Sequence, residues 1–197
     1  MLLMDFEEVV VRRRSTRKFK EDPIPEQILN KVLETGRWAP SASNSQPWRF
    51  IVVTDIEVKR RIAVMSTEFS RKAWSKFTPQ RARYLAARGG SWDKSRIAKI
   101  PVLLTVCYEI VEGIREKLVL GSVWAAIENM LLAATAEGLG SCIYTFYNID
   151  EENSLKEILR VPRSFRIAAM IQLGYAASEP PSPARKALNE IVSHERF

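Results

Sequence analysis

The sequence is poor in the side chains on which many catalytic and metal sites depend. It has two cysteines and one histidine among its 197 residues. Even together, these three residues cannot complete a four-ligand zinc site within one chain, and two cysteines cannot build a disulfide scaffold. The single histidine, His194, lies close to the end of the sequence. We therefore do not expect a Ser-His-Asp triad or another mechanism that needs a firmly held histidine base.

Glycine and proline are also limited, to 8 and 10 residues, which excludes a collagen-like or low-complexity chain. The composition, 46% hydrophobic and 27% charged, is typical of globular proteins. A chain of this length buries roughly 70% of its unfolded surface, enough for one self-sufficient core. Because we find no internal repeat or linker, we predict a single domain over residues 1–197.

Long apolar runs are nearly absent. From Leu118 to Ala136 the only charged residue is Glu128, and 19 residues could just cross a bilayer. The mid-segment Glu128 and the many small residues instead favour a buried core helix or a dimer-interface helix. The first five residues turn acidic too early for a secretory signal. Together with the low cysteine content, this predicts a cytoplasmic protein without a membrane partner.

The net charge of +7 is unevenly distributed. Residues 12–20 hold six basic residues and no acid, and residues 71–99 hold nine basic residues against one acid. Such local excesses attract anionic ligands. Nucleic acid and the phosphate of a nucleotide are both compatible with this pattern.

Helical and extended patterns alternate along the chain, but not as a regular βαβ repeat. Apolar spacing, caps and breakers predict helices near 5–12, 25–38, 55–65, 117–137 and 150–159, and strands near 49–54, 102–108, 141–146 and 166–173. Residues 15–19 are expected to be extended, 66–100 polar and partly helical, and the tail from Pro180 extended. No G-x-G-x-x-G or Walker loop occurs, and Gly138 and Gly140 are interpreted as the stop of the preceding helix.

Two short segments have side chains suited to ligand binding. In an extended chain Arg13, Ser15 and Arg17 project from one face, and guanidinium groups with a hydroxyl suit a phosphate monoester. The loop of residues 40–46 offers Asn44 and Gln46, whose amides can both donate and accept at the edge of a planar heterocycle. Taken singly, the first segment is better explained as a solvated basic turn, and the second as an ordinary turn between a helix and a strand.

In combination, these segments resemble the nitroreductase family of flavoproteins. The resemblance runs from about residue 6 to 192 and is weak across 66–100. It rests on a basic-Ser-x-Arg segment, a Pro-Ser-x-x-Asn-x-Gln-Pro-Trp loop, a helix followed by Gly-Leu-Gly-Ser-Cys, and a C-terminal Arg-Lys pair. The matching segments are Arg13–Phe19, Trp38–Val53, Ala125–Thr145 and Ala184–Val192.

The resemblance implies an α+β fold, a three-layer sandwich whose central, mostly antiparallel sheet is flanked by helices. It also implies a homodimer with FMN at the subunit interface and an extended C-terminal arm, residues 176–197, exchanged between subunits. The implied FMN-binding residues lie in the N-terminal segment, the loop from the other subunit, the segment after Gly-Leu-Gly-Ser and the C-terminal basic pair. They are Arg13, Arg14, Ser15, Arg17, Pro40, Ser41, Ala42, Ser43, Asn44, Gln46, Ile143, Tyr144, Thr145, Arg185 and Lys186.

The implied activity is hydride transfer from NAD(P)H, by way of the flavin, to an electron-poor small molecule such as a nitroaromatic or a quinone. The flavin carries this chemistry, so no dedicated acid or base is needed, in keeping with the lack of histidine. The variable segment 66–100 is expected to cover the substrate as a lid, with the basic and aromatic residues Trp74, Phe77, Arg81, Tyr84 and Trp92 against a planar or anionic ligand.

Three other interpretations remain open at this point. A basic nucleic-acid-binding protein would explain the charge, although no helix-turn-helix, zinc or RNP motif is visible and we expect no nucleic-acid partner. A flavin-binding protein without turnover is a second. A dehalogenating or flavin-cleaving relative is a third.

Overall fold

The computed structural model describes residues 4–87, 91, 93–146 and 148–197. The expectations for residues 1–3, for the glycine pair 89–90 and for Trp92 lie outside this range. A four-stranded sheet of order β1-β2-β4-β3 forms the centre of the protein, and all its neighbouring strands are antiparallel. The strands are β1 (Trp48–Val53), β2 (Val102–Glu109), β3 (Gly140–Tyr144) and β4 (Phe165–Gly174).

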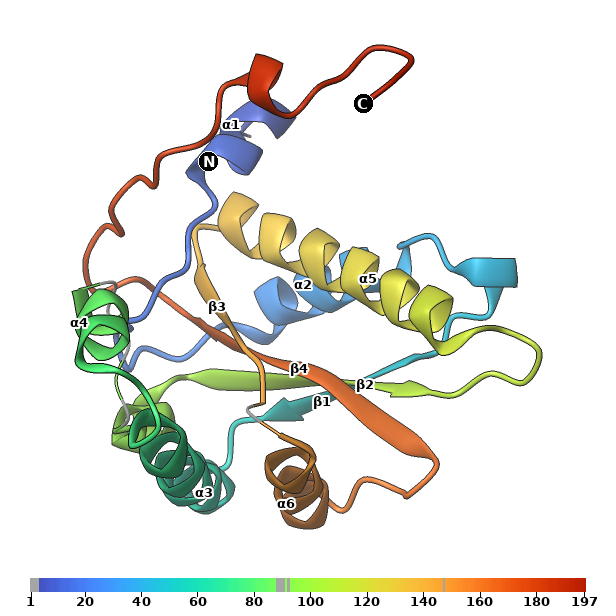
Figure 1. Ribbon diagram of the computed structural model, residues 1–197. Coiled ribbons are helices and arrows are strands. Elements are labelled where there is room, and N and C mark those ends of the chain that lie inside the picture. Colours follow the sequence, from blue (N-terminus) through green and yellow to red (C-terminus); the bar gives the residue numbers. More distant parts are fainter. Residues whose placement is uncertain (1–3, 88–90, 92, 147) are drawn as a thin grey trace.

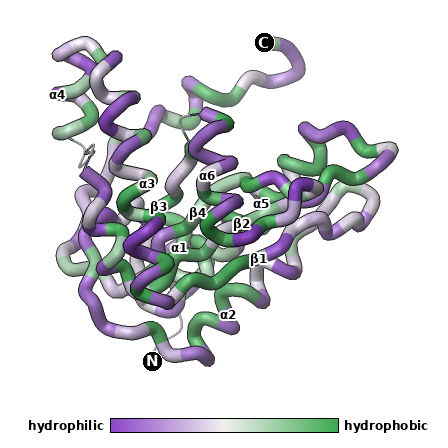
Figure 2. Tube along the Cα trace, turned by 90° about the horizontal axis from the view of Figure 1, so that it is seen from below, coloured by the Kyte–Doolittle hydropathy of each residue, from purple (hydrophilic) through white to green (hydrophobic). Residues whose placement is uncertain are grey.

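Helices cover both faces of this sheet (Figure 1). One face packs against α2 (Glu26–Arg37) and α5 (Glu116–Ala136), and the other against α3 (Ile56–Trp74) and α6 (Ile149–Leu159). Successive side chains of a strand point to opposite faces of the sheet. Leu104 and Ile171 therefore belong to the first core, under α2 and α5, and Leu103 and Met170 belong to the second core, under α3 and α6. The expected three-layer α+β sandwich is therefore confirmed, and Figure 2 shows the predominantly hydrophobic strands at its centre.

The apolar helix α5 belongs to the core. By length and composition it is the one described helix that could cross a membrane. It contacts α2 and three strands, and its Val123, Ala126 and Ile127 are fully buried. This packing is that of a core helix in a soluble protein. Gly138, with φ +78°, follows its C-terminal cap in the left-handed conformation that ends many helices, as expected.

The helix predicted over 55–65 is longer in the structure. It begins after Asp55, whose side chain accepts a hydrogen bond from the Val58 N–H, and continues to Trp74. Met65 and Phe69 pack into the second core, so burial of this face continues the helix through a polar stretch. The segment predicted as a lid from residue 66 thus begins inside α3. It continues as α4 (Pro79–Ala87), which buries no residue, and the 3-10 helix η2 (Ser95–Lys99).

The α6 helix is joined to β4 by a buried carboxylate. Glu152 accepts two hydrogen bonds from Arg166, at 2.9 and 3.0 Å, and a third from the Ile167 N–H. Burial opposes ionisation of Glu152, but the hydrogen bonds from Arg166 and Ile167 outweigh it, so the pKa of the carboxyl lies below its ordinary value.

The segment between α1 (Phe6–Arg12) and α2 runs beside the sheet. Ser15 forms an isolated bridge with Ser141 at the start of β3, and the Thr16 N–H donates to the Ser141 carbonyl at 2.8 Å. Phe19 bridges to Ala176, just after β4. Gly140 permits this approach, because a Cβ at this position would lie 2.5 Å from the Thr16 hydroxyl oxygen. Gly140 was interpreted from the sequence as part of a helix stop; in the structure it is the contact point for Thr16.

The C-terminal arm leaves the body after β4 (Figure 1). Its residues 181–197 are all exposed, including the large apolar side chains Leu188, Ile191 and Val192. The arm contains only one short element, η3 (Leu188–Glu190). An extended arm was expected from the sequence; its exchange with a second subunit stays a prediction.

Candidate functional site

Residues from both ends of the chain line one cavity, which we call the arm cavity. Its volume is about 880 Å³. The N-terminal segment supplies Arg13, Arg14, Ser15 and Arg17, and the arm supplies Arg185 and residues 178–184. The structure thus brings four basic side chains and one hydroxyl of the predicted binding set together across some 170 positions of sequence. Lys186, also predicted, does not line the cavity.

The arginines of the arm cavity have different local partners. Arg13 forms an ion pair with Glu128 of α5, with 3.3 Å between Nε and Oε1. Arg14 donates from Nη2 to the Ser182 hydroxyl at 3.0 Å and from Nη1 to the Val11 and Arg13 carbonyls. Arg14 therefore ties the arm to the N-terminal segment.

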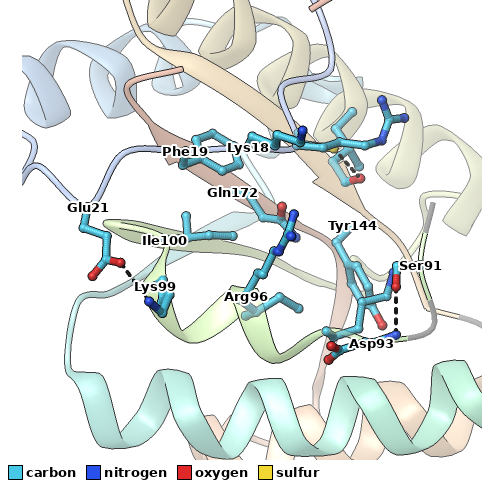
Figure 3. A pocket seen from close by; sticks show the side chains of 15 residues that line it. Lys18, Phe19, Glu21, Ser91, Asp93, Arg96, Lys99, Ile100, Tyr144 and Gln172 are labelled. Carbon is cyan, nitrogen blue, oxygen red and sulfur yellow. Dashed lines mark hydrogen bonds and ion pairs between the residues drawn. The ribbon is translucent and has the colours of Figure 1, made fainter. Parts of the chain in front are cut away.

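A second cavity, the sheet cavity, lies next to the first. Its volume is about 670 Å³, and it shares Arg17 and Lys18 with the arm cavity. Its walls come from the N-terminal segment, η2, β3 and β4 (Figure 3). Two predicted residues, Ile143 and Tyr144, line it; Thr145 follows β3, is exposed and does not.

A hydrogen bond to α6 fixes the Tyr144 side chain in the wall of the sheet cavity. Its hydroxyl donates to the carboxylate of Glu151, a fully buried residue in the first turn of α6. Burial and the nearby Glu151 raise the pKa of Tyr144, so the phenol stays protonated. Lys94 lies 5.8 Å from the centre of the Tyr144 ring, and burial lowers the pKa of its ammonium. Burial likewise raises the pKa of the Cys142 thiol in the same wall.

The predicted loop of residues 40–46 lies away from both cavities within one chain. It packs on α5, where the Ala42 N–H donates to the Ser122 hydroxyl, and Figure 1 shows it at the opposite end of α5 from the arm. Ser43, Asn44 and Gln46 have φ values of 53°, 52° and 45°, a conformation that L-residues other than asparagine and aspartate seldom adopt. Among the described residues, neither cavity includes Pro40, Ser41, Ala42, Ser43, Asn44 or Gln46.

The lid residues also lie outside both cavities in the single chain. Trp74 and Phe77 contact each other with ring centres 5.8 Å apart, and the Arg81 guanidinium lies 5.0 Å from the Phe77 ring. Tyr84 is exposed on α4. Of α4, only Ala87 reaches the wall of the arm cavity. The structure therefore groups Trp74, Phe77 and Arg81 with one another rather than with the predicted binding residues.

Several cavity residues were not found from the sequence. Lys18, Arg96 and Gln172 line the sheet cavity, and Ser182 the arm cavity. Gln172 had one recognisable signal, since it is the only polar residue in the apolar run of β4 after Arg166. The others come from exposed polar segments, where sequence alone does not separate a cavity wall from a solvated surface.

The structure is an α+β fold with two adjacent cavities, both lined by basic side chains, beside its sheet. The nitroreductase family model matches residues 10–175, and the chain belongs to the nitroreductase family. Among curated relatives it is 28% identical over 181 residues to the iodotyrosine deiodinase of Thermotoga neapolitana, covering 92% of each chain. It is also 28% identical over 201 residues to a Thermus thermophilus NADH dehydrogenase, covering 96% of each.

Solved structures agree with this assignment. An oxidised iodotyrosine deiodinase bound to FMN and 3-iodo-L-tyrosine superposes with a TM-score of 0.87 at 26% identity, covering 98% of this chain and all of the other. A nitroreductase family protein from Clostridium novyi gives 0.69 at 27% identity, covering 90% and 88%.

Proposed function

We propose that this protein is an FMN-dependent oxidoreductase that transfers hydride from NADH or NADPH to an electron-poor small molecule such as a nitroaromatic or a quinone. The observation that carries the proposal is the arm cavity, where Arg13, Ser15, Arg17 and Arg185 converge from the two ends of the chain. Membership of the nitroreductase family and the FMN-bound relative support the same conclusion.

The side chains of the arm cavity suit the phosphate of FMN. Guanidinium groups and a hydroxyl are the donors that a phosphate dianion prefers, because each contact is a charge-assisted hydrogen bond. Arg13, which is paired with Glu128, would contribute positive charge, and Arg14 would act by holding the arm at Ser182. Ser15 and Arg17 are fixed in place by the backbone contacts of Thr16 with β3.

The sheet cavity would accommodate the ring system and the reacting substrates. Its volume and its mixed apolar and basic wall are within the usual range for small-molecule pockets. When bound, FMN would supply a ring that accepts and donates hydride. Ile143 and Tyr144 would pack against it, and Arg17 and Lys94 would stabilise negative charge close to it.

A second copy of the chain would complete the site. The loop of residues 40–46 lies away from both cavities of its own chain, yet three of its residues are held in an unusual left-handed conformation. Such strain is retained where a loop has a binding role. We propose a homodimer in which this loop reaches the partner's flavin, Thr145 and Lys186 approach it, and the arm exchanges. We further propose that the protein is a single domain in the cytoplasm and that it has no nucleic-acid or membrane partner. Trp74, Phe77, Arg81 and Tyr84 would form the lid over the substrate.

Reductive dehalogenation is the second candidate. Relatives over nearly the full chain are named iodotyrosine deiodinases, and one of them superposes closely in its FMN- and iodotyrosine-bound structure. The two candidates share cofactor, fold and cavity and differ in the acceptor. Release of iodide from 3-iodotyrosine, compared with reduction of a nitroaromatic, separates them.

The test begins with the absorbance spectrum of the purified protein, which should be that of a flavin. Under nitrogen, NADH or NADPH should bleach it, and a nitroaromatic or a quinone should restore it. Steady-state kinetics should give parallel double-reciprocal lines, because the two substrates use the cavity in turn. A colourless protein that cannot be loaded with FMN would refute the proposal, and a yellow protein that no reduced nicotinamide bleaches would refute the oxidoreductase activity.

Substitution at Arg17 tests the phosphate assignment. Arg17→Ala removes a charge-assisted donor shared by both cavities and should weaken FMN affinity by about 10–100-fold. Lys20→Ala is the matched control, because Lys20 is a basic residue of the same segment that lines neither cavity. Equal FMN affinity in the two variants would contradict the assignment.

A further inference from the structure

The sheet cavity holds more positive charge than its acids balance. Five basic residues line it against Glu21 and Asp93: Arg17, Lys18, Lys94, Arg96 and Lys99. Lys99 is neutralised by Glu21, with 3.1 Å between Nζ and Oε1. The Asp93 carboxylate accepts from the Ser95 N–H at 2.8 Å, and this bond is the main reason for its lowered pKa.

Four of these cations, Arg17, Lys18, Lys94 and Arg96, have no ion pair in the described part of the chain. Arg96 nevertheless lies near enough to Asp93 to contribute a minor part of its pKa shift. In Figure 3 the Arg96 side chain extends from η2 toward Gln172, and the Lys18 side chain lies along the opposite wall. Lys94 lies against the Tyr144 ring and Arg17 is proposed to bind the phosphate of FMN, which leaves Lys18 and Arg96 for a further ligand.

In the view of Figure 3, Gln172 lies between Lys18 and Arg96, and all three line the sheet cavity. It is in β4, opposite Leu103 of β2 and Cys142 of β3 in the register, and its strand neighbours Ile171 and Leu173 are fully buried. Its amide makes no side-chain hydrogen bond within the residues that the structure describes, although it is only partly exposed. A half-buried amide without a partner in the sheet is costly unless a ligand or solvent satisfies it.

We infer that Lys18, Arg96 and Gln172 form an anion subsite that selects substrates carrying a carboxylate or a phosphomonoester group. This inference rests on the proposed oxidoreductase function and specifies the substrate class of the same cavity. Two cations and an amide donor provide the charge and the hydrogen bonds that such a group needs. Arg96 and Gln172 line only the sheet cavity, whereas Lys18 lines both cavities, so the FMN affinity of each variant separates this subsite from the proposed phosphate site. A substrate carboxylate or the 2′-phosphate of NADPH would satisfy it.

The experiment compares paired substrates that differ only in the anionic group. The acceptors are para-nitrobenzoate and the neutral para-nitrobenzamide, and the donors are NADPH and NADH. The variants are Arg96→Gln and Lys18→Gln, both exposed positions whose change should not affect folding. Lys99→Gln is the matched control, because it removes a charge from the same cavity that Glu21 already neutralises. The FMN affinity and the melting temperature are measured for every protein.

The expected result is selective. Arg96→Gln and Lys18→Gln should each lower kcat/KM for one anionic substrate by about tenfold or more, while its neutral or dephosphorylated counterpart changes less than about twofold. A selective loss with para-nitrobenzoate assigns the subsite to the acceptor, and a selective loss with NADPH assigns it to the donor. Titration calorimetry of para-nitrobenzoate or of 2′-phospho-AMP into the oxidised protein should show the same loss of affinity without turnover.

Other outcomes would overturn the inference. Equal changes for anionic and neutral substrates, or an effect as large in Lys99→Gln, would show that the residues do not recognise an anionic group. A fall in FMN affinity in Arg96→Gln would show that they hold the flavin instead. In each of these cases activity with para-nitrobenzamide and NADH still reports on the proposed function, so its failure is distinguished from failure of the inference.

Discussion

Gly140 controls how closely the phosphate-binding segment packs on the sheet, and Gly140→Ala tests this contact. The added Cβ would lie 2.5 Å from the Thr16 hydroxyl oxygen, 2.7 Å from Cγ2 and 2.8 Å from Cβ. Ordinary contacts between such atoms are about 3.5–4 Å, so Thr16 would have to move by about 1 Å. Thr16 is only 3% exposed and its N–H is bonded to Ser141, so the backbone on both sides would move with it.

This displacement should lower both the stability of the fold and the affinity for FMN. Overpacking of this kind costs about 1–3 kcal/mol in stability. A shift of 1 Å at Ser15 and Arg17 would also weaken at least one charge-assisted hydrogen bond to the phosphate, about 1.5–3 kcal/mol. We therefore expect FMN affinity to fall by about 10–100-fold, measured as quenching of flavin fluorescence during titration of the apoprotein.

The Thr16→Gly substitution supplies the rescue, because it removes all three atoms that the new Cβ would meet. Thr16→Gly alone should lower stability, since it deletes a buried side chain and adds backbone freedom. In the double variant, Gly140→Ala should cost little further FMN affinity, a coupling of at least about 1 kcal/mol. Unchanged affinity in Gly140→Ala, or the same loss with and without the Thr16 side chain, would refute the reasoning.

Three further predictions concern stability and reactivity. Arg166→Met leaves the buried Glu152 carboxylate without its cation and should lower the free energy of unfolding by about 3 kcal/mol in urea titrations, the low end of the usual range because Arg166 is 37% exposed. The pKa of Glu152 is lower in the folded than in the unfolded protein, so the stability contributed by its ion pair with Arg166 is present at neutral pH and is lost as pH falls through the folded-state pKa. If the free energies of unfolding of variant and parent differed by the same amount down to acid pH, this prediction would be wrong. Burial raises the pKa of the Cys107 thiol to about 12, so at pH 8 iodoacetamide should label it only after unfolding, and rapid labelling of native protein in mass spectra would disprove its burial. Arg160, exposed at the end of α6 with φ 54°, should give a gain of about 0.5–1 kcal/mol when replaced by glycine, and a lower melting temperature for Arg160→Gly would count against relief of backbone strain.

The sequence predicts best where short-range physics decides the outcome. The Arg13–Arg17 segment carries its donors on neighbouring positions, so its suitability for an anionic ligand can be predicted from the sequence, and the structure places these residues along one cavity. The apolar runs of β2 and β4 and the helical spacing of α2 likewise identify the layers of the sandwich. The helix expected to end near Met65 continues to Trp74 because Phe69 gains burial from the second core, which is a tertiary effect.

The candidate site was predicted less completely, because its walls are assembled from distant segments. Gln172, Arg96 and Lys18 lie in three separate parts of the sequence and meet only when β4, η2 and the N-terminal segment pack together. Gly140 was assigned to a helix stop, since nothing local reveals that Thr16 will lie against it. The lid side chains Trp74, Phe77 and Arg81 were chosen for their chemistry, and in the single chain they contact one another instead of a cavity.

The tether between Arg14 and Ser182 makes occupancy of the arm cavity and the position of the arm mutually dependent. A ligand bound between the N-terminal segment and residues 178–185 stabilises the docked position of the arm. By thermodynamic reciprocity, docking of the arm raises the affinity for that ligand by the same factor. A partner that binds the exposed Leu188 and Ile191 of the arm in its docked position therefore also tightens retention of the occupant, so that dilution should weaken retention and assembly in parallel.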